Sequence, residues 1–272
     1  MTSTTAPRQA RRPSRSGAIW RGVAGVLGLS IVLEIVSRSG IVDQKYLPPF
    51  SEVIVRSFTL WGDQQFRDDV ASTLLTYLIG LGISIVIAVP LGALFGMSRP
   101  IYRGARAVIE LLRPIPPVAL IPLVLLMLGS GMEMKVVIVV FAAVWPIMFN
   151  TLYGVHDVDP YAKDMARSFG IGRFGIIRRI VIPSAAPFIM TGVRISSSIA
   201  LIVVITVELI AGGAQGIGAY ISRLRGSYND AADTYLSVLA ATIMAGLIGL
   251  LINLLIGWFE RRFFGWEARD SA

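Results

Sequence analysis

Cysteine is absent from this sequence of 272 residues, histidine occurs once, and lysine occurs only three times. Without cysteine the chain has no disulfide framework, cysteine-ligated metal site or thiol nucleophile. The single His156 cannot supply a histidine-rich metal site. A phosphate-binding P-loop needs a lysine directly after a glycine, whereas Lys45, Lys135 and Lys163 all follow other residues. We therefore expect neither an ATP site nor a cofactor in this chain.

Charge is also scarce. Charged residues make up 15% of the chain, hydrophobic residues 54%, and the mean hydropathy is +0.69. Soluble domains carry about 25% charged residues, so the expected solvent is a lipid bilayer. A net charge of +8 could indicate nucleic-acid binding, but the basic residues gather at the ends of apolar segments, where they orient membrane proteins. We expect no nucleic-acid partner and, because no HExxH or GxSxG motif occurs, no enzymatic activity.

Long apolar runs are the main feature that is present. A membrane-spanning helix needs about 20 mostly apolar residues. Six segments qualify: Ala18–Val36, Val70–Met97, Ala107–Leu128, Met134–Tyr153, Ala185–Ile210 and Tyr235–Trp258. The predicted fold is an all-α polytopic membrane protein. Its parts are a disordered basic tail (1–17), a transmembrane domain (18–262) and a short C-terminal tail (263–272).

The basic residues favour one orientation in the membrane. They lie in the N-terminal tail, after the second segment (Arg99, Arg103, Arg106), after the fourth (Lys163 to Arg179) and after the sixth (Arg261, Arg262). The opposite loops balance basic with acidic residues. Because positive loops stay in the cytoplasm, both termini are expected to be cytoplasmic.

Prolines interrupt the chain at two places. Pro48 and Pro49 end one element, and Ser51 is a reasonable N-cap for a short interfacial helix from Glu52 to Trp61. Arg113–Pro117 brings three prolines to the third apolar segment, which weakens its backbone hydrogen bonding. This second interruption is compatible with a kinked packing helix or with a broken helix that lines a pathway.

The loop 154–183, between the fourth and fifth segments, is amphipathic. Asp159 followed by Pro160 predicts a helix start. Tyr161, Met165 and Phe169 then form an apolar stripe, which Gly170 and Gly172 end. Lys163 and Arg167 lie on another face, and a second amphipathic stretch follows. The apolar stripe must be covered by neighbouring helices or by a separate protein, and the residues alone favour neither.

This loop resembles the EAA loop of binding-protein-dependent ABC importer permeases. The family pattern is Glu-Ala-Ala, three residues, Gly, nine residues and Ile-x-Leu-Pro. This sequence has Asp164-Met165-Ala166, then Gly170, then Ile180-Val181-Ile182-Pro183 at the same spacing. Met165 is larger than the usual alanine. Further motifs resemble the nitrate, sulfonate and taurine branch: Leu47-Pro48-Pro49, Arg113–Pro117, Thr191-Gly192 with Arg194, and Glu208 through Gly212-Gly213 to Gly216-Ile217-Gly218.

The resemblance implies a homodimer of permease chains in a bacterial inner membrane. It also implies two separate ATPase subunits that bind ATP and Mg, and an extracytoplasmic binding protein that delivers a small anion such as a sulfonate, taurine or nitrate. The residues implied to couple the permease to the ATPase are Ala162, Asp164, Met165, Ala166, Phe169, Gly170, Gly172, Ile180 and Pro183. The main alternative is a stand-alone secondary transporter, for which we find neither coupling-ion sites nor an internal repeat.

The fifth segment holds the candidate pathway residues. Arg194 and Glu208 are 14 residues apart, close to four helical turns, so they share a face. Ser198 and Leu201 fall near the same stripe. Ionisable groups in a span are costly and usually face a cavity or a partner. The four residues are therefore candidate pathway-lining groups, although for Arg194 or Glu208 taken alone the favoured interpretation is extension to the nearer membrane interface. Asn253 and Glu34 are weaker candidates of the same kind.

Overall fold

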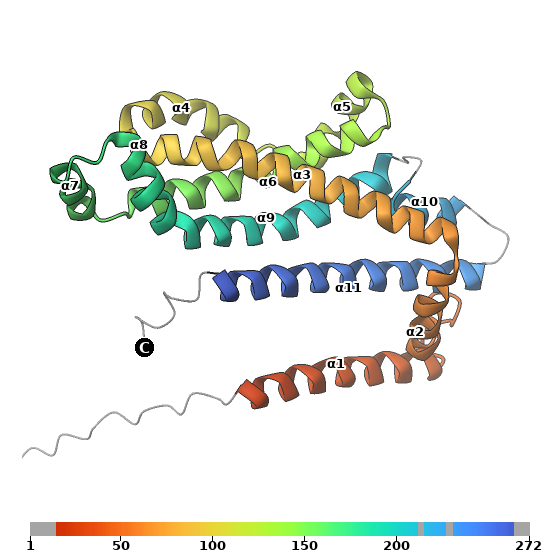
Figure 1. Cartoon of the computed structure of the whole chain (residues 1–272). Helices are drawn as coiled ribbons and strands as arrows, with labels where there is room; N and C mark the ends of the chain where they lie inside the picture. The colour runs from red at the N-terminus through yellow and green to blue at the C-terminus, as the bar shows by residue number, and fades with distance from the viewer. Residues whose placement is uncertain (1–14, 212–214, 227–230, 264–272) are drawn as a thin grey trace, which may run out of the picture.

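The structure, a computed structural model, describes residues 15–211, 215–226 and 231–263, and these ranges are helical without a strand. The elements are α1 (Arg15–Arg38), α2 (Phe50–Thr59), η1 (Leu60–Gly62), α3 (Gln64–Met97), α4 (Arg99–Leu112), η2 (Pro117–Leu120), α5 (Ile121–Leu128), α6 (Met132–His156), α7 (Pro160–Ser168), α8 (Arg173–Ile176), η3 (Ile177–Val181), α9 (Ile182–Ala211), α10 (Ile217–Gly226) and α11 (Ala231–Phe263). The all-α prediction is confirmed for these ranges (Figure 1). The predicted tails lie outside the described residues, except that 15–17 begin α1 and 263 ends α11.

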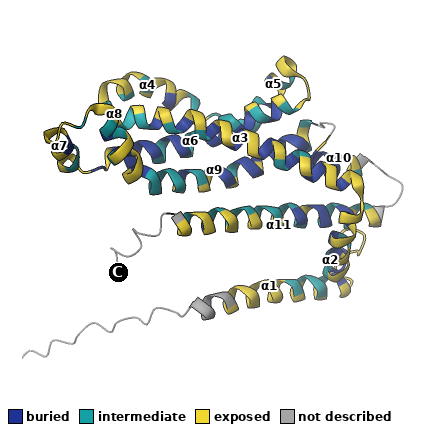
Figure 2. Ribbon diagram, in the orientation of Figure 1, coloured by how far each residue is buried: buried dark blue, intermediate teal, exposed yellow. Residues whose placement is uncertain are grey.

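The helices α3, α6 and α9 pack side by side and form the main core (Figure 1). Glycines on α3 permit the close approach to α6. A Cβ added at Gly80 would lie 2.5 Å from Val139 Cγ1, and one added at Gly96 would lie 2.8 Å from the carbonyl oxygen of Leu152. Small residues bring helices close where lipid provides no hydrophobic force between them. The dark blue residues of Figure 2 mark this shared interior.

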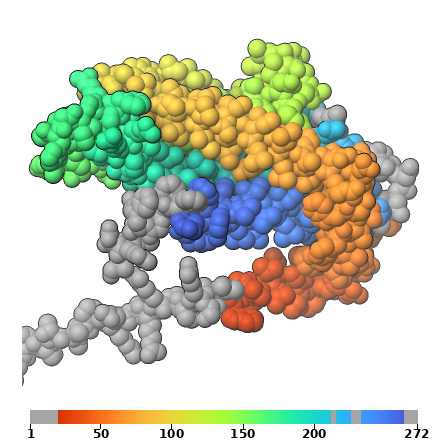
Figure 3. Space-filling view, viewed as in Figure 1, coloured from red at the N-terminus to blue at the C-terminus, as the bar shows by residue number. Residues whose placement is uncertain are grey.

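A second apolar cluster joins α2, α10, α11 and the beginning of α3. It includes Val53, Phe66, Ile217, Tyr220 and Ala240. By contrast, only 6% of the candidate span in α1 is buried. The helix contacts α2, and Figure 3 shows open space between α1 and α11. An apolar helix in this position is exposed to lipid or to another chain.

The third of the six predicted segments is a broken helix in the structure, which was one of the two alternatives that its prolines left open. Among the described residues, five helices are long and apolar enough to cross a membrane. The segment predicted as Ala107–Leu128 is instead divided between α4 and the pair η2–α5, which meet at a bend of 78°. The prolines in Arg113–Pro117 account for the break, because each lacks the backbone N–H that continues a helix. Helix α4 and the segment η2–α5 count as a sixth span only if together they cross the membrane once.

The predicted N-cap of the short interfacial helix is wrong. Helix α2 begins at Phe50, with Pro49 in the N-cap position. Ser51 lies inside the first turn, where its N–H and hydroxyl donate to the Glu34 carboxylate at 3.0 and 2.9 Å. A carboxylate from α1 thus satisfies a free amide at the start of α2. This contact gives Glu34 a structural role in joining α1 to α2.

Candidate functional site

The loop between α6 and α9 contains helix α7, whose two ends are defined by local hydrogen bonds. At its start, the Asp159 carboxylate accepts from the Tyr161 N–H at 2.9 Å. At its end, Gly170 has φ +74° and donates to the Arg167 carbonyl at 2.9 Å, while Ile171 donates to the Ala166 carbonyl at 3.0 Å. This pair of bonds is a Schellman motif. The predicted start at Asp159 and end at Gly170 are confirmed.

The apolar stripe of α7 points away from the protein. Tyr161, Met165 and Phe169 are 79%, 62% and 80% exposed. Ala166, on the side of the helix next to the stripe, is buried in a small cluster that includes Val155 and other residues of α6, α8 and α9. Neighbouring helices therefore hold α7 by Ala166 but leave the stripe uncovered. Figure 1 shows α7 and α8 together at one end of the α3–α6–α9 core.

The remaining loop residues lead directly into the fifth predicted span. Asp164 forms an exposed ion pair with Arg167 at 2.7 Å, and Ala162 is half-buried. Gly172 precedes α8 with an ordinary φ of −64° and has open space around it. The half-buried Ile180 lies in η3, a π-helical stretch, and Pro183 follows in the first turn of α9. A proline disrupts the hydrogen bonding of the turn before it, which explains the looser helix there.

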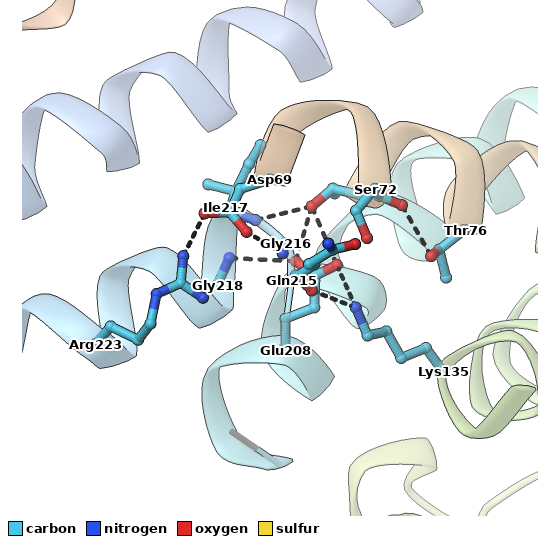
Figure 4. Close-up of polar contacts among 11 residues, drawn as sticks. Asp69, Ser72, Thr76, Lys135, Glu208, Gln215, Gly216, Ile217, Gly218 and Arg223 are labelled. Carbon is cyan, nitrogen blue, oxygen red and sulfur yellow. Dashed lines mark hydrogen bonds and ion pairs between the residues drawn. The ribbon is translucent and has the colours of Figure 1, made fainter. Parts of the chain in front are cut away.

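Glu208, near the end of α9, lies in a buried polar cluster. Its side chain is 0% exposed and its carboxylate accepts from three donor groups (Figure 4). Thr73 Oγ1 donates at 2.8 Å, Lys135 Nζ lies 3.2 Å away, and the Gly218 N–H donates at 3.2 Å. The charge is therefore satisfied by three elements: α3, α6 and α10.

The same cluster holds the turn that leads from α9 into α10. The Gly216 N–H donates to Asp69 at 2.7 Å, and the Ile217 N–H donates to Thr73 Oγ1 at 2.9 Å. Lys135 Nζ donates to the carbonyl oxygen of Gln215 at 2.5 Å. In the glycine motif quoted from the sequence, Gly216 and Gly218 thus lie at the start of α10, whereas Gly212 and Gly213 lie outside the described residues.

Two glycines allow the turn before α10 to pack closely against α9. Gly216 has φ +132°, and a Cβ added there would overlap the Glu208 carboxylate. A Cβ added at Gly218 would overlap the Ile205 carbonyl oxygen. The turn therefore lies directly on α9, with its amides facing inward. Arg223 of α10 completes the contact through an ion pair with Asp69.

Sequence reasoning identified Glu208 but missed its partners Thr73 and Lys135. It also missed the pair formed by Asp69 and Arg223, which holds the adjoining turn and α10. One signal was available, because a lysine near the start of an apolar helix is expensive unless it finds a partner. Which carboxylate Lys135 would meet depends on the packing of α6 against α9. Within the described ranges, no group of three or more histidine, aspartate and glutamate residues is arranged to hold a metal ion.

The predicted pathway residues of α9 separate into two places. Arg194 contacts α11 through Asn253 at 3.2 Å and Glu260 at 3.3 Å. Ser198 and Leu201 line a hollow of about 320 Å³ between α9 and α11, together with Ser197, Ile202, Ala245, Gly246, Gly249, Leu250, Ile252 and Asn253. Glu208 lies apart from that hollow, about 21 Å along the helix from Arg194 at 1.5 Å per residue.

Comparison with known proteins identifies the family of this chain. Residues 80–265 match the family described as the binding-protein-dependent transport system inner membrane component. The taurine transport system permease protein of Escherichia coli is 29% identical over 251 residues, covering 88% of each chain. The nitrate import permease protein of Leptolyngbya laminosa is 28% identical over 200 residues, covering 74% of this chain and 70% of the relative.

The fold is also similar to that of a solved transporter. In the crystal structure of a bacterial ABC transporter involved in the import of alginate, one chain matches with a TM-score of 0.59 and 19% identity. The match covers 90% of this chain and 93% of that one. The relatives named for taurine and nitrate agree with the nitrate, sulfonate and taurine branch that the sequence motifs indicated. This chain belongs to the binding-protein-dependent inner membrane components and is a permease subunit of the ABC importer family.

Proposed function

We propose that this permease carries a small anion across a bacterial inner membrane and is driven through α7 by a separate ATPase. Two copies of the chain would form the pathway, two ATPase subunits would bind ATP and Mg, and an extracytoplasmic binding protein would deliver the substrate. Both termini would be cytoplasmic, on the side of the ATPase. The observation that carries the proposal is the exposed apolar stripe of α7.

That stripe has the properties of a docking surface. Tyr161, Met165 and Phe169 expose most of their side chains from a loop that is otherwise charged. Contiguous apolar groups exposed outside the spans of a membrane protein mark a protein interaction site. The Asp159 cap and the Schellman motif at Gly170 fix the ends of the helix, so it is ordered before any partner binds. The larger Met165 side chain would add to the contact.

The coupling residues have different roles in this proposal. Met165 and Phe169 would contact the ATPase directly, whereas Ala166 and Ile180 anchor the loop to the core. Gly170 supplies the turn, and the remaining members, Ala162, Asp164, Gly172 and Pro183, lie in the same segment. A push on α7 would then reach α9 through packed side chains.

The proposed pathway lies along α9 where it faces α11. The hollow lined by Ser198 and Leu201 combines hydroxyl, amide and aliphatic groups, and Arg194 is at its end with Asn253. Although Arg194 pairs with Glu260, its side chain is still 49% exposed, so its guanidinium would remain available to attract a small anion to the polar hollow. Glu208 is buried in the described structure, so it would shape the pathway through α10. The anionic substrate is inferred from relatives named for taurine and nitrate.

A second permease chain is supported by the position of α1. This apolar helix stands away from α11 and buries little of its surface within one chain (Figure 3). A second copy would cover it and would close the hollow between α9 and α11 from the other side. A stand-alone secondary transporter has no comparable support, because it gives the exposed stripe of α7 no role.

Co-purification of a separate ATPase subunit with the tagged permease tests the proposal. The variant Met165→Asp with Phe169→Asp places two charges on the stripe and should abolish both ATPase retention and uptake. The variant Ser168→Asp adds one charge at an exposed position of the same helix beside the stripe, and it should retain more of the ATPase than the doubly charged variant. Retention and uptake by the doubly charged variant would show that α7 is not the coupling contact.

A further inference from the structure

A hollow of about 400 Å³ lies where α3 and α6 end and the loop from α7 to η3 turns back toward them. Four basic side chains line it: His156 at the end of α6, Lys163 and Arg167 on α7, and Arg173 at the start of α8. No acidic residue is among its lining residues. These groups come from separate elements, so the concentration of positive charge is a product of the fold.

The charge in this hollow is not neutralised by the chain itself. Arg167 has an ion pair with Asp164, but Lys163 and Arg173 form no ion pair within the part of the chain that the structure describes. The C-terminal ends of α3 and α6 contribute only about half a negative charge each. Lys163 and Arg173 carry two positive charges, and the two helix ends together supply about one negative charge. Roughly one positive charge is therefore not neutralised, and His156 is not included in this sum.

The base of the hollow is apolar. Ile176 and Val181 line it and are 6% and 3% exposed, and Met97 is a third apolar lining residue. The long apolar helices α3 and α6 both end here, so the hollow lies at the boundary between hydrocarbon and water. A site with basic side chains above an apolar base suits a ligand with a phosphate and an adjoining hydrocarbon part. Basic pockets between helices at this level bind anionic lipid headgroups.

We propose that this hollow binds the headgroup phosphate of an anionic phospholipid. Lys163 and Arg173 hold the phosphate, and the glycerol and upper acyl carbons lie against Ile176 and Val181. The bound lipid bridges α7 and α8 to the end of α3 and so steadies the loop. Lys163 and Arg167 lie on the side of α7 opposite to the exposed apolar stripe. The lipid site and the proposed ATPase contact therefore use different faces of this helix.

The lipid site and the ATPase contact are independent. The apolar stripe requires a protein surface, whereas the hollow requires one negative group with a short apolar extension. Only the membrane location of the chain is needed for the lipid proposal, and failure of either proposal leaves the other standing. The two are distinguished by the variants that affect them.

Native mass spectrometry of the full chain in detergent micelles tests the site. Phosphatidylglycerol and phosphatidylcholine with identical acyl chains are titrated against the wild type. They are also titrated against Lys163→Gln with Arg173→Gln and against the matched control Arg178→Gln with Arg179→Gln. The control removes the same charge from exposed positions of the same loop that do not line the hollow. At about 1 kcal/mol per basic residue, the first variant should bind phosphatidylglycerol roughly 30-fold more weakly. The control should stay within about twofold of the wild type.

Several results would overturn the proposal. Equal losses in the two double variants would show diffuse attraction by the whole loop, and equal wild-type affinity for both lipids would remove the role of the headgroup charge. Displacement of phosphatidylglycerol by millimolar inorganic phosphate would identify a free-anion site. If the hollow variant instead loses the ATPase and keeps phosphatidylglycerol, the cations pair with carboxylates of that subunit. Circular dichroism verifies folding, and Arg173→Gln alone repeats the test should the double variant unfold.

Discussion

Lys135 of α6 and Glu208 of α9 form an ion pair 3.2 Å long in the protein interior, with side chains 5% and 0% exposed. The pair stabilises a contact between two helices, and it also holds the backbone of a turn, because Lys135 bonds Gln215 and Glu208 bonds Gly218. Two charges within a membrane protein thus determine where α10 lies.

Replacing Lys135 by methionine should destabilise the protein strongly. The buried Glu208 carboxylate would lose its cation, and breaking a buried pair from one side costs about 3–5 kcal/mol. The thermal unfolding midpoint in detergent is the measurement. The double variant Lys135→Met with Glu208→Gln should recover most of the loss, because no unpaired charge is left. A single variant as stable as the wild type would contradict a closed ion pair in the folded protein.

Gly216→Ala should release the turn before α10. The backbone there has φ +132°, and the new methyl group would overlap the Glu208 carboxylate. Strained backbone alone costs about 1–3 kcal/mol, so we expect a lower unfolding midpoint. Gly104→Ala is the control, because Gly104 lies in a helix with open space around it. That substitution should be neutral or slightly stabilising. Equal effects at both positions would contradict the described docking of the turn.

Gly170→Val should uncouple the permease from its ATPase and leave membrane insertion intact. The valine would occupy a left-handed backbone position at a cost of about 1–2 kcal/mol, which would break the Schellman motif that ends α7. Gly172→Ala provides a matched comparison, since Gly172 has φ −64° and no atom near its missing side chain. ATPase retention on a tagged permease should fall for the first variant only. Loss of insertion instead would make the loop a folding element.

Ser198→Cys should react with a membrane-impermeant thiol reagent if the hollow between α9 and α11 is an aqueous pathway. The absence of native cysteine makes this measurement free of background. Thr206→Cys, on the same helix but not among the residues lining the hollow, is the comparison and should react much more slowly. Substrate added with its binding protein should slow the labelling of Cys variants at position 198. If the two cysteine variants react equally slowly, the pathway does not run through this hollow.

The parts of this structure that the sequence predicted well depend on nearby residues. The start of α7 at Asp159 and its end at Gly170 follow from caps whose donors and acceptors are at most five residues apart. The predicted cap at Ser51 was wrong because a carboxylate from another helix, that of Glu34, bonds its amide. Likewise, Lys135 and Glu208 are separated by 73 positions, and their meeting depends on the packing of two helices.

The third apolar segment also shows that the sequence predicts local features better than features that depend on packing. Its prolines indicated a weakened helix, and the structure confirms an interruption near Arg113–Pro117. The bend of 78° could not be predicted, because missing hydrogen bonds allow a change of direction without setting its angle. The surrounding helices set that angle through contacts with η2 and α5.

The helical path from Arg173 to Ala211 runs for 39 residues without an intervening loop. At 1.5 Å per residue it is about 58 Å long, and it joins the segment beside α7 to the buried carboxylate of Glu208. A displacement applied at α8 would therefore act on the same continuous helix that carries Glu208. The π-helical stretch before Pro183, where the proline removes a backbone hydrogen bond, would be the part of that helix that resists twisting least.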